Sequence, residues 1–253
     1  MCGRYALNIS GGDLAIEFAA GLKDAAITAS NWNISPTTVI PFINSEDEKG
    51  VERSINTARW GLIPTWAKDA SRQVNAINAR VESIAEKPTF KSAFKSRRCL
   101  IPVTGYYEWA TELGKYKPKQ PFYISHKNKQ TLAIAGLYET WTNPATNSPI
   151  TTAAIITREA AGIVAPIHHR MPVILPKDLW STWIGNKSLS PDEMNDLKND
   201  EFHKNLMDNV NKFSYKNSGG KKTYGTKGFK KRHKQKKTRK NKVKKYKKNI
   251  KIR

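Results

Sequence analysis

The segment PFYISHKNKQTLAIAGLY, residues 121–138, decides the fold class. Its two ends, PFYI and LAIAGLY, are apolar and aromatic, and they flank a polar turn at Lys127-Asn128, which is the pattern of two neighbouring strands. The next apolar segment, residues 150–156, is rich in β-branched side chains and predicts a strand in the centre of a sheet. The middle of the chain is therefore expected to be built from strands.

Shorter segments of regular pattern extend from this region towards both ends of the chain. Strand patterns occur at residues 38–43, 54–62, 99–103, 106–109 and 172–175, and helical patterns occur at 12–20, 179–184 and 190–197, with helical turns at 81–94 interrupted by Pro88. The last helix has a start signal in Ser190-Pro191-Asp192-Glu193. This mixture predicts an α+β protein whose mainly antiparallel sheet curls into a barrel-like core flanked by helices.

Positive charge is concentrated at the carboxyl end of the chain. The 253 residues carry a formal net charge of +23, but residues 216–253 contain 19 of the 44 Lys and Arg residues and no acidic residue. Residues 1–215 therefore carry a net charge of only about +4. A segment so charged cannot bury enough apolar surface to offset the entropy cost of ordering. We expect one folded domain over residues 1–215 and a disordered, Lys-rich tail over residues 216–253.

Cysteine usage and hydropathy argue against several classes of protein. The two cysteines, Cys2 and Cys99, lie in no spacing typical of zinc ligands or of a disulfide framework. No apolar run approaches the roughly 20 residues of a membrane span, and the amino terminus lacks the apolar stretch of a secretory signal. We expect a soluble monomer without metal or cofactor, cytoplasmic or nucleoid-associated in a bacterium and nuclear in a eukaryote.

Cys2 has a chemistry that an internal cysteine lacks. Aminopeptidases remove an initiator methionine that precedes a small residue, and removal of Met1 leaves an α-amine and a thiol on adjacent carbons. The α-amine, with a pKa of about 7.7–8.0, is partly unprotonated near neutrality. It can form a Schiff base with an aldehyde, which the sulfur then closes into a five-membered thiazolidine. Position alone also allows a plainer interpretation, in which the second residue is cysteine by chance.

Three further side chains are suited to proton transfer or binding. Glu108 lies in an apolar, aromatic strand, where burial would raise the pKa of its carboxyl towards neutrality. His168, beside a second imidazole and a guanidinium, can act as a proton shuttle, and Asn78 can orient a hydroxyl or a carbonyl. Each has an ordinary alternative: a solvated strand position for Glu108, a surface loop for His168 and a helix cap for Asn78.

Five sequence blocks, taken together, resemble a known family. They are, in order, Met1-Cys2-Gly3-Arg4-Tyr5, Trp60-Gly61-Leu62-Ile63-Pro64, Asn78-Ala79-Arg80-Val81-Glu82-Ser83, Gly105-Tyr106-Tyr107-Glu108-Trp109 and His168-His169-Arg170-Met171-Pro172. Their identity and order resemble the signature blocks of the SOS-response-associated peptidase (SRAP) family over about residues 1–200. SRAP proteins sense abasic sites in single-stranded DNA and form a covalent DNA–protein crosslink with them.

The resemblance implies a role for each motif residue. The mature amino-terminal Cys2 would capture the aldehyde at C1′ of the ring-opened sugar as a thiazolidine. Glu108 would exchange protons with the Cys2 amine and the opening sugar. His168 would assist proton transfer and crosslink reversal, and Asn78 would orient the opened sugar. The family is also credited with releasing its own initiator methionine, which is a cysteine-peptidase activity.

An abasic site has no base to read, so its recognition depends on backbone charge, sugar shape and the reactive carbonyl. The resemblance implies that Arg4 and Arg80 hold phosphates, and Arg170 can supply a further phosphate contact. Trp66 and Trp109 are candidate platforms for neighbouring bases. Single-stranded DNA that contains abasic sites is therefore the expected partner.

Two other functions stay open from the sequence. A conventional cysteine peptidase would use the thiolate of Cys2 with His168 and Asn78, and it would not need the α-amine. A non-catalytic nucleic-acid-binding protein would bind through residues 216–253, with an affinity that falls steeply as salt rises. The tail itself can be a DNA-tethering arm, a localisation signal or the translation of a shifted reading frame. Within the fifth block, His169 replaces an acidic residue common in the family, and the register assigns the active imidazole to His168.

Overall fold

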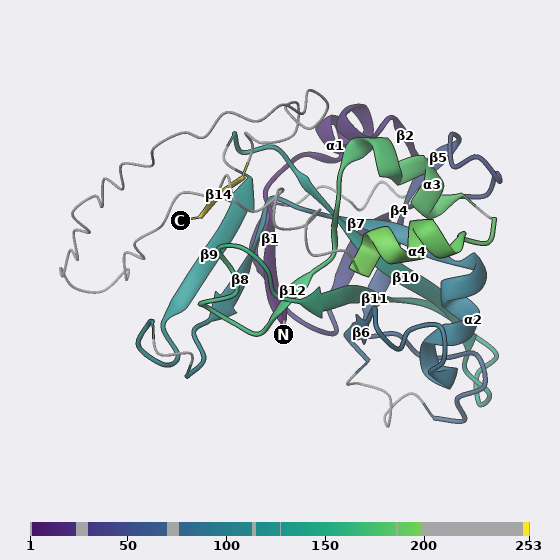
Figure 1. Cartoon of the computed structure of the whole chain (residues 1–253). Coiled ribbons are helices and arrows are strands. Elements are labelled where there is room, and N and C mark those ends of the chain that lie inside the picture. Colours follow the sequence, from purple (N-terminus) through teal and green to yellow (C-terminus); the bar gives the residue numbers. More distant parts are fainter. Residues whose placement is uncertain are drawn as a thin grey trace.

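The computed structural model describes residues 2–23, 30–69, 76–112, 115–126, 128–185, 187–198 and 250–252. The helices are α1 (Gly11–Phe18), α2 (Pro88–Ser96), the 3-10 helix η2 (Lys177–Leu179), α3 (Trp180–Ile184) and α4 (Pro191–Lys198). The strands are β1 (Arg4–Leu7), β2 (Ala20–Leu22), β3 (Asn31–Ile34), β4 (Val39–Ser45), β5 (Arg53–Trp60), β6 (Asn78–Arg80), β7 (Arg98–Val103), β8 (Gly105–Trp109), β9 (Pro121–His126), β10 (Leu132–Thr142), β11 (Pro149–Glu159), β12 (Arg170–Pro172), β13 (Ile174–Leu175) and β14 (Ile250–Ile252). Helices α2, α3 and α4 gather on one side of the molecule, and β8 and β9 lie on the other (Figure 1).

Five strands of the larger sheet close into a barrel. Strand β11 pairs with β10, which is followed by β7, β4 and β5, and β5 pairs with β11 in turn. The first four pairings are antiparallel. The last is parallel, with Arg59 opposite Thr152 and Trp60 opposite Ala153. The predicted α+β fold with a mainly antiparallel, barrel-like sheet is therefore confirmed.

Strand β11 is the predicted central strand, and it has apolar neighbours on both faces. Ala153 and Ile155 pack in a cluster that contains residues of the barrel and of β1 and β8. Ala154 and Ile156 pack in a second cluster, which contains residues of α1, α2 and α3. A strand that is buried on both faces has no solvated side, and its sequence is therefore continuously apolar instead of alternating.

A second sheet, with the strand order β14-β9-β8-β1-β3, positions the amino terminus. Strand β1 runs antiparallel to β8, with Arg4 opposite Tyr107 and Tyr5 opposite Tyr106. The sequence patterns do not predict β1 and β3, because each has only four residues of mixed polarity and gives little periodic signal. This pairing places the first residues of the chain beside the strand that contains Glu108.

The helix boundaries differ from the prediction at one proline. Pro88 begins α2 instead of interrupting a run of helical turns, because the first turn of a helix does not need the N–H that proline lacks. Helix α4 begins as predicted. The Ser190 hydroxyl accepts a hydrogen bond from the Glu193 N–H, and the Glu193 carboxylate accepts one from the Ser190 N–H.

Most of the predicted disordered tail, residues 216–249, lies outside the described residues. The structure differs from the prediction at Ile250–Ile252, which form β14 and pair antiparallel with β9. The sequence Ile-Lys-Ile has the alternation of a strand, and an edge strand such as β9 offers backbone groups for pairing. Among the described residues, no helix is long and apolar enough to cross a membrane.

Candidate active site around Cys2

Strands β1 and β8 bring Cys2 and Glu108 together. Arg4 lies opposite Tyr107, so the same register, continued by one residue, places Gly3 level with Glu108. Cys2 is fully buried and Glu108 is 1% exposed. The negative charge of Glu108 acts on the Cys2 thiol, whose pKa is raised mainly by burial and also by this charge. The predicted nucleophile and the predicted acid/base residue are therefore neighbours.

The Glu108 carboxyl is poised to exchange protons near neutral pH. Alternation along β8 turns Tyr106 and Glu108 towards the core, whereas Tyr107 and Trp109 are more exposed. Burial raises the pKa of Glu108 to about 7, although the positive charge of the chain's amino terminus opposes part of this shift. The prediction that burial shifts this carboxyl towards neutrality is confirmed, and such a group can both give and accept a proton.

His168 supplies a neutral imidazole beside this carboxyl. Its Nε2 lies 4.0 Å from Glu108 Oε2, which is longer than a hydrogen bond. The Arg170 backbone N–H donates a hydrogen bond of 2.9 Å to His168 Nδ1, which also lies 3.1 Å from the Arg170 carbonyl oxygen, and these two contacts hold the ring in place. Burial lowers the pKa of His168 to about 4. At pH 7 the two side chains are therefore not an ion pair, because the imidazole has no charge.

The second histidine of the motif occupies a different position. The ring of His169 stacks on that of His168, with centroids 4.4 Å apart. His169 is exposed, whereas His168 is buried and faces Glu108. The geometry therefore supports the assignment of the active imidazole to His168.

Asn78 lies against the first residues of the chain. Strand β6 runs parallel to β11, with Asn78 opposite Ile155. The Asn78 side-chain NH2 donates a hydrogen bond of 3.1 Å to the Cys2 carbonyl oxygen. Its Oδ1 is buried, and the described residues supply it with no hydrogen-bond partner. This unused acceptor next to Cys2 is suited to an amine or hydroxyl donor that arrives from outside the described structure.

Two tyrosines near Cys2 were not identified from the sequence. Tyr5 and Tyr106 are cross-strand partners, and both are fully buried. Within the described part of the chain, neither hydroxyl has a hydrogen-bond partner. Burial raises the pKa of both phenols, and the charge of Cys2 adds to the shift in each. The signal that identifies Tyr106 is its position two residues before Glu108 in a strand, which places both on one face.

Replacement of Tyr106 by phenylalanine should stabilise the fold. A buried hydroxyl without a partner loses its hydration on folding and gains nothing in return, so Tyr106→Phe is expected to raise the free energy of unfolding by about 1 kcal/mol. Thermal melting should show a midpoint higher by about 2–4 °C. Tyr138→Phe is the matched control, because the Tyr138 hydroxyl accepts a hydrogen bond from Asn44 and its removal should destabilise. Destabilisation by Tyr106→Phe would show that its hydroxyl is satisfied in the folded protein.

Arg170 joins the third and fifth sequence blocks. Its guanidinium forms a two-pronged ion pair with Glu82, with N–O distances of 2.7 and 2.9 Å. It also donates to the Thr157 carbonyl oxygen, and Arg170 is only 8% exposed. Arg170 therefore fixes the segment that contains His168, and it does not present its charge on the open surface.

The other predicted DNA contacts are on or near the surface. Arg80 is exposed on β6 and Arg4 is half-buried on β1, where Arg4 donates to the Asn33 side-chain oxygen. Trp109, 42% exposed, follows Glu108 directly, whereas Trp66, 58% exposed, lies in the loop after β5. Arg4 and Trp109 therefore lie on β1 and β8, the strands that bring Cys2 and Glu108 together, whereas Trp66 lies in a separate loop.

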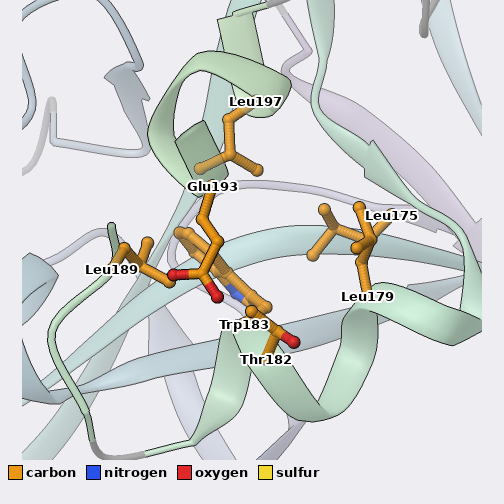
Figure 2. Close-up of a pocket in the computed structure, with 7 residues that line it drawn as sticks. All are labelled: Leu175, Leu179, Thr182, Trp183, Leu189, Glu193 and Leu197. Carbon is orange, nitrogen blue, oxygen red and sulfur yellow. The ribbon is translucent and has the colours of Figure 1, made fainter. Parts of the chain in front are cut away.

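The pocket in Figure 2 lies away from Cys2. It is a small apolar hollow, lined by Leu175, Leu179, Thr182, Trp183, Leu189, Glu193 and Leu197. Its lining is mostly apolar, and it contains none of the residues of the candidate site. Among the described residues, no group of three or more His, Cys, Asp and Glu side chains could hold a metal ion.

The fold and the site together define a class of protein. In this chain a mainly antiparallel barrel and a smaller sheet hold a cysteine next to the amino terminus, beside a buried carboxyl and a neutral imidazole. The chain belongs to the SRAP family: the family model described as "SOS response associated peptidase (SRAP)" matches residues 1–212.

Individual relatives and solved structures are similar over most of the chain. The abasic site processing protein YoqW of Bacillus subtilis is 36% identical over 200 residues, which cover 78% of this chain and 86% of YoqW. The abasic site processing protein HMCES of Gallus gallus is 29% identical over 215 residues, covering 70% of this chain and 63% of HMCES. A crystal structure of a Bacteroides thetaiotaomicron protein superposes with a TM-score of 0.69 at 28% identity, covering 78% of this chain and 86% of that one.

Proposed function

We propose that the protein processes abasic sites in single-stranded DNA by capturing them covalently through Cys2, after Met1 has been removed. The observation that supports this most is the position of Cys2 beside a carboxyl whose pKa is about 7 and an imidazole whose pKa is about 4. The names of the relatives, which describe abasic site processing, support the same substrate. Such a protein acts where DNA is, in the cytoplasm or the nucleus.

The covalent step is a condensation that releases one water molecule. The α-nitrogen of Cys2 attacks C1′ of the ring-opened sugar, and the carbonyl oxygen takes up a proton to give a carbinolamine. The hydroxyl then leaves as water when it receives a second proton, and an imine remains. The Cys2 sulfur adds to the imine carbon, and the thiol proton passes to the nitrogen. The product is a thiazolidine that joins the protein to the DNA.

Glu108 is suited to move these protons. A carboxyl with a pKa of about 7 is partly protonated at neutral pH, so it can donate a proton to the departing hydroxyl and then accept the proton of the thiol. The Nε2 of His168 lies 4.0 Å from Oε2 of the same carboxyl, and a proton on this nitrogen would stabilise the ionised carboxylate. The unused acceptor of Asn78 and the hydroxyls of Tyr5 and Tyr106 are suited to hold the amine and the oxygens of the opened sugar.

The electrostatics of the site favour this chemistry over that of a conventional cysteine peptidase. A peptidase of that kind pairs a thiolate with a protonated imidazole. Here burial raises the pKa of the Cys2 thiol and lowers that of His168, so neither member of that ion pair is charged at neutral pH. Attack by an unprotonated amine needs no thiolate.

The surface residues of the site fit a DNA partner. We assign phosphate contacts beside the abasic sugar to Arg4, which is half-buried on β1, and to Arg80, which is exposed on β6. Trp109 lies next to Glu108 and can cover a neighbouring base, and Trp66 can contact DNA farther along the strand. The guanidinium of Arg170 is engaged by Glu82 and Thr157. We therefore propose that Arg170 contributes by holding the segment that contains His168 in place, and not by contacting a phosphate.

A chain with one alanine inserted between Met1 and Cys2 tests the proposal. Removal of Met1 from this variant gives an amino-terminal alanine, so the thiol is kept but its nitrogen becomes an amide. We expect no denaturant-resistant adduct with single-stranded DNA that contains one abasic site, because an amide nitrogen cannot form the imine. The adduct is measured by denaturing electrophoresis, with the unaltered chain as control. An adduct of equal yield from both chains would show that a free α-amine on Cys2 is not required.

A further inference from the structure

The outer surface of the smaller sheet has a row of aromatic side chains, which we call the aromatic face: Trp32, Tyr107, Trp109 and Tyr123. Tyr107 lies opposite Tyr123 across β8 and β9, and their ring centroids are 4.9 Å apart. Trp32 of β3 is 6.4 Å from Tyr123 between centroids, and the Tyr107 hydroxyl donates to the Trp32 carbonyl oxygen. Trp109 follows Tyr107 by two residues, so it shares this face of β8.

This face is accessible to solvent although its side chains are large and apolar. Trp32 is 55% exposed and Trp109 is 42% exposed, and both tyrosines are partly exposed. The Tyr123 ring lies across Gly105, where a Cβ atom would collide with the ring and with the Ile124 carbonyl oxygen. The absence of a side chain at Gly105 therefore allows an aromatic ring to lie close to the backbone of the sheet.

The aromatic face is continuous with the proposed active site. Arg4 lies opposite Tyr107 on the neighbouring strand, so a guanidinium is a member of the same row. Glu108 lies between Tyr107 and Trp109 in the chain but on the opposite side of the sheet, towards Cys2. The aromatic face and the active site therefore use the two sides of the same strands, β1 and β8, and Trp109 of the face is the direct chain neighbour of Glu108.

We propose that the aromatic face binds the bases next to the abasic nucleotide in single-stranded DNA. This inference rests on the proposed function and extends it to Trp32, Tyr107 and Tyr123. Exposed aromatic rings stack with bases of any sequence. Tyr107 and Tyr123 lie on the neighbouring strands β8 and β9, and the ring of Trp32 reaches from β3 to within 6.4 Å of the Tyr123 ring. Arg4 within the row supplies a positive charge for the phosphate that joins two such bases.

The alternative is that these rings only pack against one another and stabilise the sheet, as cross-strand aromatic pairs do. That role predicts a loss of stability on substitution and no effect on DNA affinity. The two roles differ in whether the affinity depends on bases beside the abasic nucleotide. The test therefore compares two DNA probes on each protein variant.

Both probes are short single strands with one tetrahydrofuran residue, an abasic analogue without an aldehyde, at the centre. In the first probe thymidines flank this residue, and in the second every flanking nucleotide is also tetrahydrofuran. Trp32→Ala and Tyr123→Leu are each expected to weaken binding of the first probe about tenfold and to leave binding of the second unchanged. Affinities are measured by fluorescence anisotropy at one salt concentration.

Two controls keep the test specific. Tyr123→Phe retains the ring and should bind the first probe like the unaltered chain. Ile16→Ala removes a side chain that is 81% exposed on α1, outside both sheets, and should change neither affinity. Equal affinity of all variants for the first probe, or an equal loss on both probes, would overturn the proposal.

The proposed function can fail separately from this inference. The unaltered chain mixed with DNA that has a natural abasic site reports on covalent capture, whereas the tetrahydrofuran probes report only on non-covalent binding. Melting temperatures of Trp32→Ala and Tyr123→Leu identify any variant that has unfolded. Because the Trp32 side chain is largely exposed, Trp32→Ala tests the face even if Tyr123→Leu unfolds.

Discussion

Cys2→Ala should abolish the denaturant-resistant adduct with abasic DNA and leave an adduct that appears only with a reducing agent. After removal of Met1, the variant still has an α-amine that can form an imine, but it has no sulfur to close the thiazolidine. The imine hydrolyses on denaturation unless cyanoborohydride reduces it. We therefore expect background yield without reductant and substantial yield with it, both measured by denaturing electrophoresis.

The unaltered chain and Cys99→Ala are the controls for this experiment. Cys99 is also buried and free, but it lies in β7 and its nitrogen is part of the chain. Cys99→Ala should form the adduct without reductant. If Cys2→Ala gave the full yield of adduct without reductant, the proposal that the product is a thiazolidine would be wrong. If this variant gave no adduct even with reductant, the proposal that the amino-terminal nitrogen attacks the sugar would be wrong.

Glu108→Gln should slow covalent capture by a factor of about 100 to 10,000, the range expected when a general acid–base group is lost. The amide keeps the size of the side chain but cannot exchange a proton near neutral pH. In the unaltered chain, the pH profile of the capture rate should bend near pH 7, the pKa of Glu108, and this bend should be absent from the variant. Single-turnover rates over a range of pH measure both effects.

The pH dependence of stability separates this role from a structural one. Glu108 binds its proton more tightly in the folded protein, where its pKa is about 7, than in the unfolded chain, where it is about 4.5. Its contribution to stability is therefore fully present below pH 4.5 and is lost as the pH rises through 7, by about 3 kcal/mol in total. Glu108→Gln lacks this loss, so the stability of the variant relative to the unaltered chain should be higher at pH 8 than at acidic pH. A slow variant that is also less stable at pH 8 would indicate misfolding.

Much of the barrel could be predicted from the sequence, because its strands produce a local signal. The run at 150–156 is apolar on both faces, and it is part of β11. The closure of the barrel could not be predicted, since it depends on a parallel pairing between β5 and β11, which are about 90 residues apart. Such a pairing leaves no periodic pattern in either strand.

In the candidate site, too, features that depend on neighbouring residues could be predicted, whereas contacts between distant segments could not. The aromatic neighbours of Glu108 in the sequence favour burial but leave a solvated position open, and the structure buries the side chain and raises its pKa. The engagement of Arg170 by Glu82 does not follow, because two separate blocks must meet before the ion pair exists. The pairing of Tyr5 with Tyr106 depends in the same way on β1, a strand too short to predict from its pattern.

Intact-mass analysis of the purified adduct, together with a peptide map, tests whether the first residue forms a thiazolidine. The central claim is that the α-nitrogen and the thiol of the same first residue, Cys2, both bond to C1′ of the sugar. We expect an intact mass equal to the chain without Met1 plus the DNA, less one water, and a peptide map that places the DNA on an amino-terminal cysteine whose sulfur a thiol-alkylating reagent no longer modifies. A chain that retains Met1 and forms the adduct with similar efficiency would contradict the account.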